Sequence, residues 1–200
     1  IIATKTELWP ESPEKVLAMR ADYASSNPDL VLRLTRAICQ ACAWLDQASN
    51  RREAAAILSR PHYVGLPEQI LLRSLLDQLV RSAGFTGKPT TDVILFNKRG
   101  ANLPWVSHAV WILTQMIRWG QVRTPFEIEN LAQSVYRTDL YRSAIAPFEI
   151  VTPKHDEKSE GGGRFFGDET FDPADPISYL DGLRLRDRSI DLAMFDGTPR

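Results

Sequence analysis

Residues 96–120, FNKRGANLPWVSHAVWILTQMIRWG, constrain the fold more than any other stretch of this chain. The segment starts as a polar turn and then takes on the spacing of a helix, which Pro104 can begin and Gly120 can end. Its apolar residues recur at steps of three and four and form one stripe: Trp105, Ala109, Ile112, Met116 and Trp119. The pattern therefore predicts one long helix with a buried side.

The opposite side of this helix does not have the composition of a solvent-facing surface. Its polar residues are Ser107, Thr114, Gln115 and Arg118, and Trp111 stands among them. A large aromatic residue on a polar face indicates either a helix covered on both sides or a tryptophan shielded by neighbouring side chains.

Other proline and cap patterns predict further helices. Ser12 and Pro13 begin one that continues to about Ala24, and Asn27 with Pro28 begins a long one of about five turns. Residues 1–3 resemble a short strand, and residues 4–10 a turn. We expect most of residues 13–144 to be helical, with strand confined to residues 1–3 and 93–96.

Four more helix starts follow from the same kinds of pattern. These are Asn50 with Glu53 as its capping partner, Pro67 with Gly84 as the stop, Thr124 with Glu127 as a capping box, and Thr138.

Composition restricts the class of function. The chain has 200 residues, of which 44% are hydrophobic and 24% charged, and its net charge is −1. This balance gives no electrostatic case for binding nucleic acid or an anionic membrane surface. The chain begins Ile-Ile-Ala-Thr without an initiator methionine, so we expect it to continue a longer N-terminal portion.

Cys39 and Cys42 form a C-x-x-C pair, which can be a redox motif or half of a zinc site. Here the pair lies within a helical pattern, and the sequence has no second cysteine pair. We predict reduced, buried thiols packed with Leu34, Ile38 and Leu45. The alternative is a thiol oxidoreductase, which would need accessible and acidic thiols.

The three histidines, His62, His108 and His155, are not spaced to share a metal ion on one helix. We expect no metal site and no cofactor from the residues alone. His108, beside the tryptophans of the predicted central helix, is expected to be a buried histidine with a hydrogen-bond partner.

Four separated motifs resemble one known family. They are LWPESPEKVL from Leu8, R-G-x-N-x-P-W-x-S-H-x-x-W-x-x-T-Q-M-x-x-W-G from Arg99, YRTDLYR from Tyr136, and FDPADP-x-x-Y-L from Phe171. Similar motifs occur in the C-terminal region of nitrate- and bicarbonate-binding proteins of ABC importers, a family shared with cytoplasmic nitrate sensors.

The resemblance implies a fold and an organisation. The chain would be mostly α-helical, as the C-terminal portion of a two-lobed α/β fold like that of periplasmic binding proteins. Residues 1–150 would form the helical body, residues 151–187 a connector and docking tail, and residues 188–200 a disordered end. The Gly161-Gly162-Gly163 run fits the connector.

The resemblance also implies a function without catalysis. The protein would bind nitrate, nitrite or bicarbonate and deliver it to an importer permease, in the periplasm or anchored to a membrane. Its partners would be the anion, the permease and the missing N-terminal portion, with no direct contact to nucleic acid. The alternative is a cytoplasmic nitrate sensor that releases an RNA-binding regulator.

The first turn carries the candidate ligand site. Thr4, Lys5, Thr6 and Trp9 provide donors, positive charge and an aromatic wall, directly before the expected helix start at Ser12. These groups suit a planar, weakly hydrated anion. Glu7 opposes an anion unless a cation also binds. In the bicarbonate-binding branch of the family, a carboxylate and a calcium ion occupy this neighbourhood, whereas a lysine does in the nitrate branch.

Overall fold

The computed structural model describes residues 1, 3–79, 82, 91–122, 124–161, 165–166, 169–186 and 189–196. The chain forms two compact units that interleave along the sequence. Unit 1 contains Ile1–Asn102, Ala144–Thr152 and Gly163–Phe165, and unit 2 contains Leu103–Ser143, Pro153–Gly162 and Phe166–Arg200.

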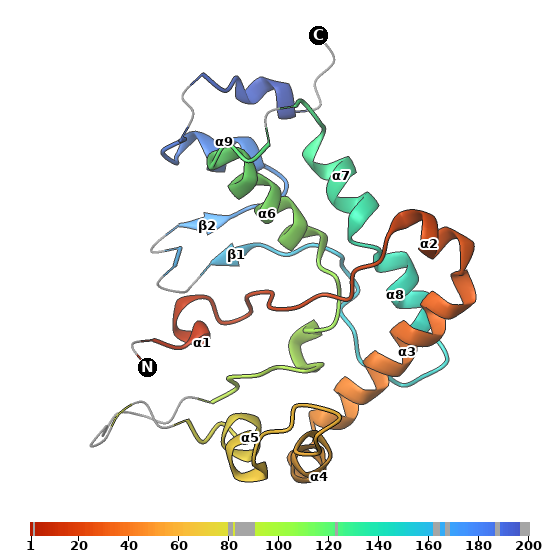
Figure 1. Cartoon of the computed structure of the whole chain (residues 1–200). Helices are drawn as coiled ribbons and strands as arrows, with labels where there is room; N and C mark the ends of the chain where they lie inside the picture. The colour runs from red at the N-terminus through yellow and green to blue at the C-terminus, as the bar shows by residue number, and fades with distance from the viewer. Residues whose placement is uncertain are drawn as a thin grey trace. The chain divides into compact units, whose positions relative to one another are not determined.

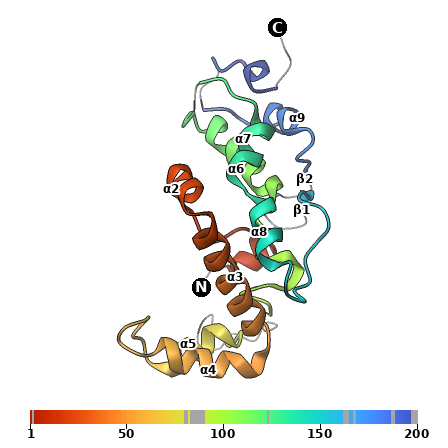
Figure 2. The same ribbon diagram turned by 90° about the vertical axis from the view of Figure 1, so that its right-hand side faces the viewer.

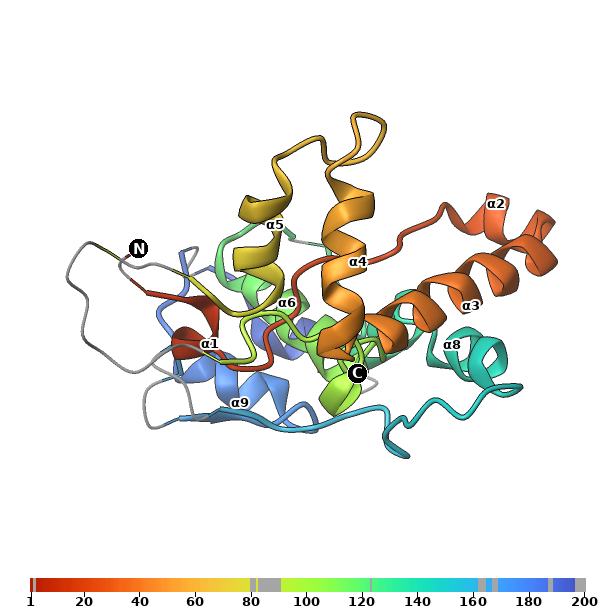
Figure 3. The same cartoon turned by 90° about the horizontal axis from the view of Figure 1, so that it is seen from below.

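Unit 1 is helical in its described part. Its elements are α1 (Lys5–Leu8), α2 (Ala21–Ser26), α3 (Pro28–Leu45), α4 (Ala48–Leu58), α5 (Glu68–Leu75) and the 3₁₀ turn η1 (Lys98–Gly100). Figure 2 shows α3 running from α2 to α4, and α4 packs alongside α5 (Figure 3). Ala54, Ala55 and Leu75 form the core between α4 and α5, with Phe96 packed against it.

Unit 2 is organised around α6 (Val106–Arg118), which packs against two helices, α7 (Ile128–Val135) and α9 (Pro176–Asp181) (Figure 1). Its other elements are α8 (Thr138–Ile145), whose end belongs to unit 1, the 3₁₀ turn η2 (Leu192–Phe195), β1 (Glu160–Gly161) and β2 (Thr170–Phe171). The two strands pair antiparallel, with Glu160 opposite Phe171.

Helix α6 ends as its sequence predicts. Gly120 adopts φ +66°, the left-handed conformation that favours glycine. Its N–H donates to the Ile117 carbonyl at 2.9 Å, and the N–H of Gln121 donates to the Met116 carbonyl at 2.8 Å. These two bonds form a Schellman cap, which satisfies carbonyls that the helix itself leaves unpaired.

The covering of α6 on both sides is confirmed, and the predicted stripe is partly correct, since Trp105 and Ala109 are buried while Ile112 and Met116 are only partly buried. Val110 and Ile117 are fully buried, whereas Trp119 is 50% exposed and lies beneath the Arg118 guanidinium. The opposite side buries Ser107 and Thr114 completely. The Thr114 hydroxyl donates to the Trp111 carbonyl at 2.7 Å, and the Ser107 hydroxyl accepts from the Lys158 N–H at 3.3 Å.

The aromatic side chain on the polar face of α6 is also covered. Trp111 meets the Phe166 ring edge-on, with centroids 6.3 Å apart, and its indole N–H points at the Tyr179 hydroxyl. Leu180, on the same helix as Tyr179, has no exposed surface. Residues that follow the expected connector thus supply the second cover of α6.

The helix predicted from Ser12 to Ala24 is wrong in its first half. Residues 12–20 contain no helical turn, and α2 begins only at Ala21. Val16 and Leu17, which would give the helix its apolar side, are 65% and 48% exposed. A short helix without a buried face has little to stabilise it in water.

Two other local predictions, the strand at residues 93–96 and the capping box at Thr124, are wrong. Residues 93–96 form no strand, and the N–H groups of Asp92 and Val93 donate to the Asp77 carboxylate instead. The capping box at Thr124 is absent, since α7 begins at Ile128 after Glu127.

The expected partner of Asn50 also differs. Its amide donates to the Trp44 carbonyl at 2.9 Å and so caps the end of α3, while α4 begins two residues earlier at Ala48. Gly84, the expected stop of the next helix, lies outside the described residues, and α5 ends at Leu75.

The range expected to be disordered, residues 188–200, contains η2 within its described part. Phe195 is buried there and packs edge-on against Phe126, with ring centroids 5.2 Å apart. This contact also draws Phe126 away from the first turn of α7. Within the described residues, no helix combines the length and apolarity needed to cross a membrane.

Replacing Gly120 with alanine is expected to lower the free energy of unfolding by about 1–2 kcal/mol, because a Cβ disfavours the left-handed conformation. Urea unfolding of the Gly120→Ala protein measures this effect. Gly182→Ala is the matched control, since Gly182 ends α9 with φ −71° and an added Cβ would meet only ordinary contacts. Equal effects of the two substitutions would contradict the role given to Gly120.

Candidate functional site

The candidate ligand residues form a short helix rather than the expected turn. Thr4 precedes α1, and the Glu7 carboxylate accepts hydrogen bonds from both the Thr4 backbone N–H, at 2.7 Å, and the Thr4 hydroxyl, at 3.1 Å. This arrangement is that of a capping box, in which a carboxylate satisfies N–H groups left free at a helix start. Glu7 therefore has a structural role in α1.

Lys5 places its charge beside this cap. Its ammonium nitrogen lies 3.2 Å from a carboxylate oxygen of Glu14, and the two side chains are 28% and 51% exposed. The Thr6 hydroxyl lies 3.0 Å from the Thr4 hydroxyl. A partly exposed ion pair of this kind contributes little to stability, so the ammonium can exchange one anionic partner for another at small cost.

Trp9 ends α1, and its N–H donates to the Lys5 carbonyl at 2.7 Å. It is buried and stacks on Phe165, with ring centroids 6.2 Å apart and planes inclined by 16°. The Phe165 N–H donates to the Leu8 carbonyl at 3.0 Å. Thr4 is buried as well, whereas Lys5, Thr6 and Glu7 remain partly exposed.

The structure thus brings the five predicted residues together but removes one support for the anion site. The helix N-terminus expected at Ser12 is absent, because residues 12–20 are not helical. Any anion bound here would rely on the Lys5 ammonium and on hydroxyl donors. The assignment of these residues to a ligand site remains a prediction.

Two surface hollows lie elsewhere. One of about 620 Å³ is lined by residues 18–20, 22–23 and 26–27 of unit 1, and one of about 710 Å³ lies in unit 2 beside α7 and α8. The second is rich in carboxylates, among them Glu157, whose pKa is raised by burial and further by the charges of Glu129, Asp156 and Asp172. No histidine, cysteine or carboxylate group within the described ranges is arranged to hold a metal ion.

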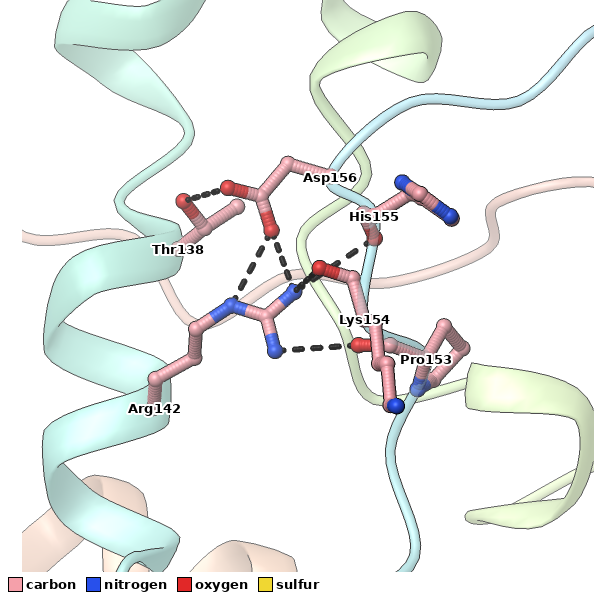
Figure 4. A network of polar contacts seen from close by, with 6 residues as sticks. All are labelled: Thr138, Arg142, Pro153, Lys154, His155 and Asp156. Atoms are coloured by element: carbon pink, nitrogen blue, oxygen red, sulfur yellow. Dashed lines mark hydrogen bonds and ion pairs between the residues drawn. The ribbon is translucent and has the colours of Figure 1, made fainter.

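The YRTDLYR motif has a structural role in unit 2 (Figure 4). Arg142 on α8 binds the Asp156 carboxylate and donates to the carbonyls of Pro153, Lys154 and His155. The Thr138 hydroxyl donates to the second carboxylate oxygen of Asp156 at 2.9 Å. The guanidinium therefore fixes residues 153–156 against α8.

A second polar cluster joins α6 to β1, and its His108 and Glu160 are buried. The Glu160 carboxylate lies 2.9 Å from His108 Nε2 and 3.1 Å from the Lys158 ammonium, which also stands over the Trp105 ring at 5.2 Å. The expectation that His108 is a buried, partnered histidine is confirmed.

Asp156 and Glu160 have roles that the sequence did not predict. Both lie where the charged run 154–158 leads into the glycines, a composition that predicts a connector. Asp156 takes its role from Arg142, which is 14 residues away in sequence, and Glu160 takes its role largely from His108, which lies on α6. The residues themselves carry no pattern that predicts such pairing.

The cysteines are free, and their environment is unsuited to thiol chemistry. Burial, together with the nearby Cys42, raises the pKa of Cys39 to about 11. Burial also raises the pKa of Cys42, although a hydrogen bond from Asn102 lowers it. Burial is confirmed for Cys39, while Cys42 is half-buried and the expected neighbours Leu34 and Ile38 are more than one-third exposed.

Comparison with known proteins identifies several with similar sequences. The NMT1-like family matches residues 1–59. The nitrate/nitrite binding protein NrtA of Synechocystis sp. (strain ATCC 27184 / PCC 6803 / Kazusa) is 34% identical over 188 residues, or 92% of this chain and 42% of the relative. The bicarbonate-binding protein CmpA of Synechococcus elongatus (strain ATCC 33912 / PCC 7942 / FACHB-805) is 32% identical over 193 residues, or 90% and 42%.

The fold agrees with these matches. The crystal structure of the periplasmic nitrate-binding protein NrtA from Synechocystis PCC 6803 superposes with a TM-score of 0.81 and 29% identity, over 90% of this chain and 48% of that protein. The chain is similar in sequence and in fold to these nitrate- and bicarbonate-binding proteins. The family resemblance and the fold class predicted from the four motifs are confirmed. The chain spans less than half the length of these relatives.

Cys39 is expected to react with an alkylating reagent far more slowly in the folded protein than in urea at pH 7.5, because the thiol is both buried and protonated. The rate in the folded protein should rise with pH until about pH 11, the pKa of Cys39. Mass spectrometry that separates Cys39 from Cys42 measures this. Equal rates in the folded and unfolded protein would favour the redox alternative.

Asp156→Asn is expected to lower the free energy of unfolding by about 1–2 kcal/mol, since it weakens the charge-assisted bonds from Arg142. Urea unfolding gives the value. The control is Asp139→Asn, because Asp139 pairs with Arg137 at a surface where the side chains are 62% and 49% exposed. That change should cost less than about 0.5 kcal/mol. A larger effect at Asp139 than at Asp156 would refute the role of the network.

Proposed function

We propose that this chain is the C-terminal portion of a two-lobed solute-binding protein that captures nitrate, nitrite or bicarbonate for an ABC importer. The observation that supports this proposal is the structural similarity to the periplasmic nitrate-binding protein NrtA, which extends over 90% of this chain with a TM-score of 0.81. Capture would occur by closure of two lobes around the anion. The protein would bind its ligand without transforming it.

Lys5 is the residue of this chain best suited to hold the anion. Its ammonium is partly exposed and has a carboxylate partner, Glu14, that is itself half exposed. A bound oxyanion could take the place of Glu14 beside the ammonium, with the Thr6 hydroxyl as a second donor. Thr4 and Trp9 would position α1 without contacting the anion, since both are buried.

Glu7 distinguishes the two branches of relatives. A bicarbonate-type site would use the Glu7 carboxylate with a calcium ion, whereas a nitrate-type site would use Lys5 and no metal. The cap that Glu7 provides for α1 supplies a reason for a carboxylate at this position without any ion. This favours the nitrate-type site, with no cofactor.

The partners and compartment follow from the same relatives. The importer permease would receive the anion, and the preceding portion of the protein would supply most of the ligand site. We place the protein in the periplasm or anchored to a membrane facing it. A cytoplasmic nitrate sensor is the less favoured alternative, because the relatives described above are binding proteins and the one with a solved structure is periplasmic. Neither role requires contact with nucleic acid by this chain.

In the full-length protein, Lys5→Ala is expected to weaken nitrate binding by roughly one to two orders of magnitude. A charge-assisted hydrogen bond contributes about 1.5–3 kcal/mol, and each 1.4 kcal/mol is a factor of ten in affinity. Lys5→Arg should be milder. Removing the competing carboxylate with Glu14→Gln should strengthen binding. Titration calorimetry with nitrate, nitrite and bicarbonate measures all three.

Lys15→Ala is the matched control, because Lys15 is an exposed lysine of the same segment. Unchanged nitrate affinity in Lys5→Ala would remove Lys5 from the site. Glu7→Gln tests the other branch, since glutamine can still accept the capping bonds while the negative charge is lost. Loss of a calcium-dependent affinity for bicarbonate in that variant would replace the nitrate assignment with the bicarbonate one.

A further inference from the structure

Helix α3 has two apolar sides, of which only one is buried. The buried side contains Val31 and Cys39. Beside it, Arg36 donates to the Ala144 carbonyl at 3.2 Å and lies over the Phe148 ring at 5.6 Å. Unit 1 therefore already covers this side of the helix.

The other side is exposed although its residues are apolar. They recur at steps of four and three along the helix, and we call them the α3 stripe: Leu30, Leu34, Ala37, Ile38, Ala41 and Trp44. The large members are each 36–38% exposed. Only a narrow polar edge, formed by Asp29, Arg33 and Gln40, separates the stripe from the buried side.

A helix that is apolar nearly all round is normally enclosed by protein, because its second face gains nothing from water. Contiguous exposed apolar surface of this kind marks an interaction site. The question is therefore which surface covers the stripe.

The distribution of the other exposed apolar residues indicates how large a surface would be needed to cover this side of unit 1. Among the described residues, all the exposed large apolar side chains belong to unit 1 except Trp119, Val135 and Met194. In unit 1 they extend beyond α3, to Val16, Leu17, Tyr23, Tyr63, Val64, Leu66 and Ile70. A surface that involves several separate segments needs a larger and less regular partner than one matching helix.

We infer that in the full-length protein the α3 stripe is buried against the part of the two-lobed fold that this chain does not include. The inference rests on the proposed function, which makes this chain a C-terminal portion. The relatives supply the necessary length, since the chain spans 42% of NrtA and CmpA and 48% of the solved NrtA structure. The same cover would give Val16 and Leu17 the apolar partner that a helix in residues 12–20 lacks.

Site-resolved thiol labelling of the full-length protein tests this inference. Ala41→Cys places a thiol in the stripe with little change in size, and Gln40→Cys places one at the neighbouring polar edge. Tandem mass spectrometry separates each new thiol from Cys39 and Cys42. The thiol at position 41 should react at least about a hundredfold more slowly than the one at position 40, because its labelling requires local opening of the protein.

Equal labelling rates at positions 40 and 41 would overturn the inference. A second copy of the protein could also protect position 41, so light scattering must give the mass. Protection in a monomer supports the inference, whereas protection found only in a dimer overturns it.

Leu34→Asp adds a second measurement. In the full-length monomer it should lower the unfolding temperature well below that of Gln40→Asp, and equal temperatures would count against burial. Nitrate calorimetry on the unmodified protein keeps the two proposals apart. A protected stripe in a protein that binds no anion would leave the inference standing while the proposed function fails.

Discussion

The need to satisfy buried hydroxyl and backbone groups along α6 determines much of unit 2. Ser107 and Thr114 have no contact with solvent, and an unpaired polar group in such a position would cost about 1–3 kcal/mol. The Ser107 hydroxyl is satisfied by the Lys158 N–H, and the Val106 N–H by the Asp156 carbonyl. These bonds require residues 156–158 to run beside the start of α6, in a position that Arg142 and Thr138 fix from α8. Two of the family motifs thus serve one structural purpose.

The candidate anion site shows how a carboxylate near a ligand can have a structural explanation. From the sequence alone, Glu7 either disfavours anion binding or serves as a calcium ligand. The structure adds a third role, because the hydrogen bonds from Thr4 to Glu7 cap α1 and hold Lys5 in place. The Lys5 ammonium pairs with Glu14 at 3.2 Å, so the potential at the site depends on Glu14. An anion bound here would compete with that carboxylate for the ammonium.

Sequence patterns predicted the elements whose determinants are local. The long α3 begins at Pro28, α8 begins at Thr138, and Gly120 ends α6, because proline, capping residues and glycine act within one turn. The failures involve partners distant in sequence. Phe126 packs on Phe195 instead of beginning α7. The Val93 N–H donates to the Asp77 carboxylate instead of pairing with a neighbouring strand. The residues of the candidate site could be named from their types, but Asp156 and Glu160 could not, since Arg142 and His108, which bind them, are distant in sequence.

The uncovered side of α3 has a consequence for how the protein is made. Translation proceeds from the N-terminus, so the preceding portion of the fold would leave the ribosome before α3 does. The stripe of Leu34, Ile38 and Trp44 would then emerge next to a surface already able to receive it. Exposed apolar surface promotes aggregation during folding, and this order of synthesis shortens the time for which α3 is exposed. A circular permutant that began at α3 would reverse that order and aggregate more readily during expression.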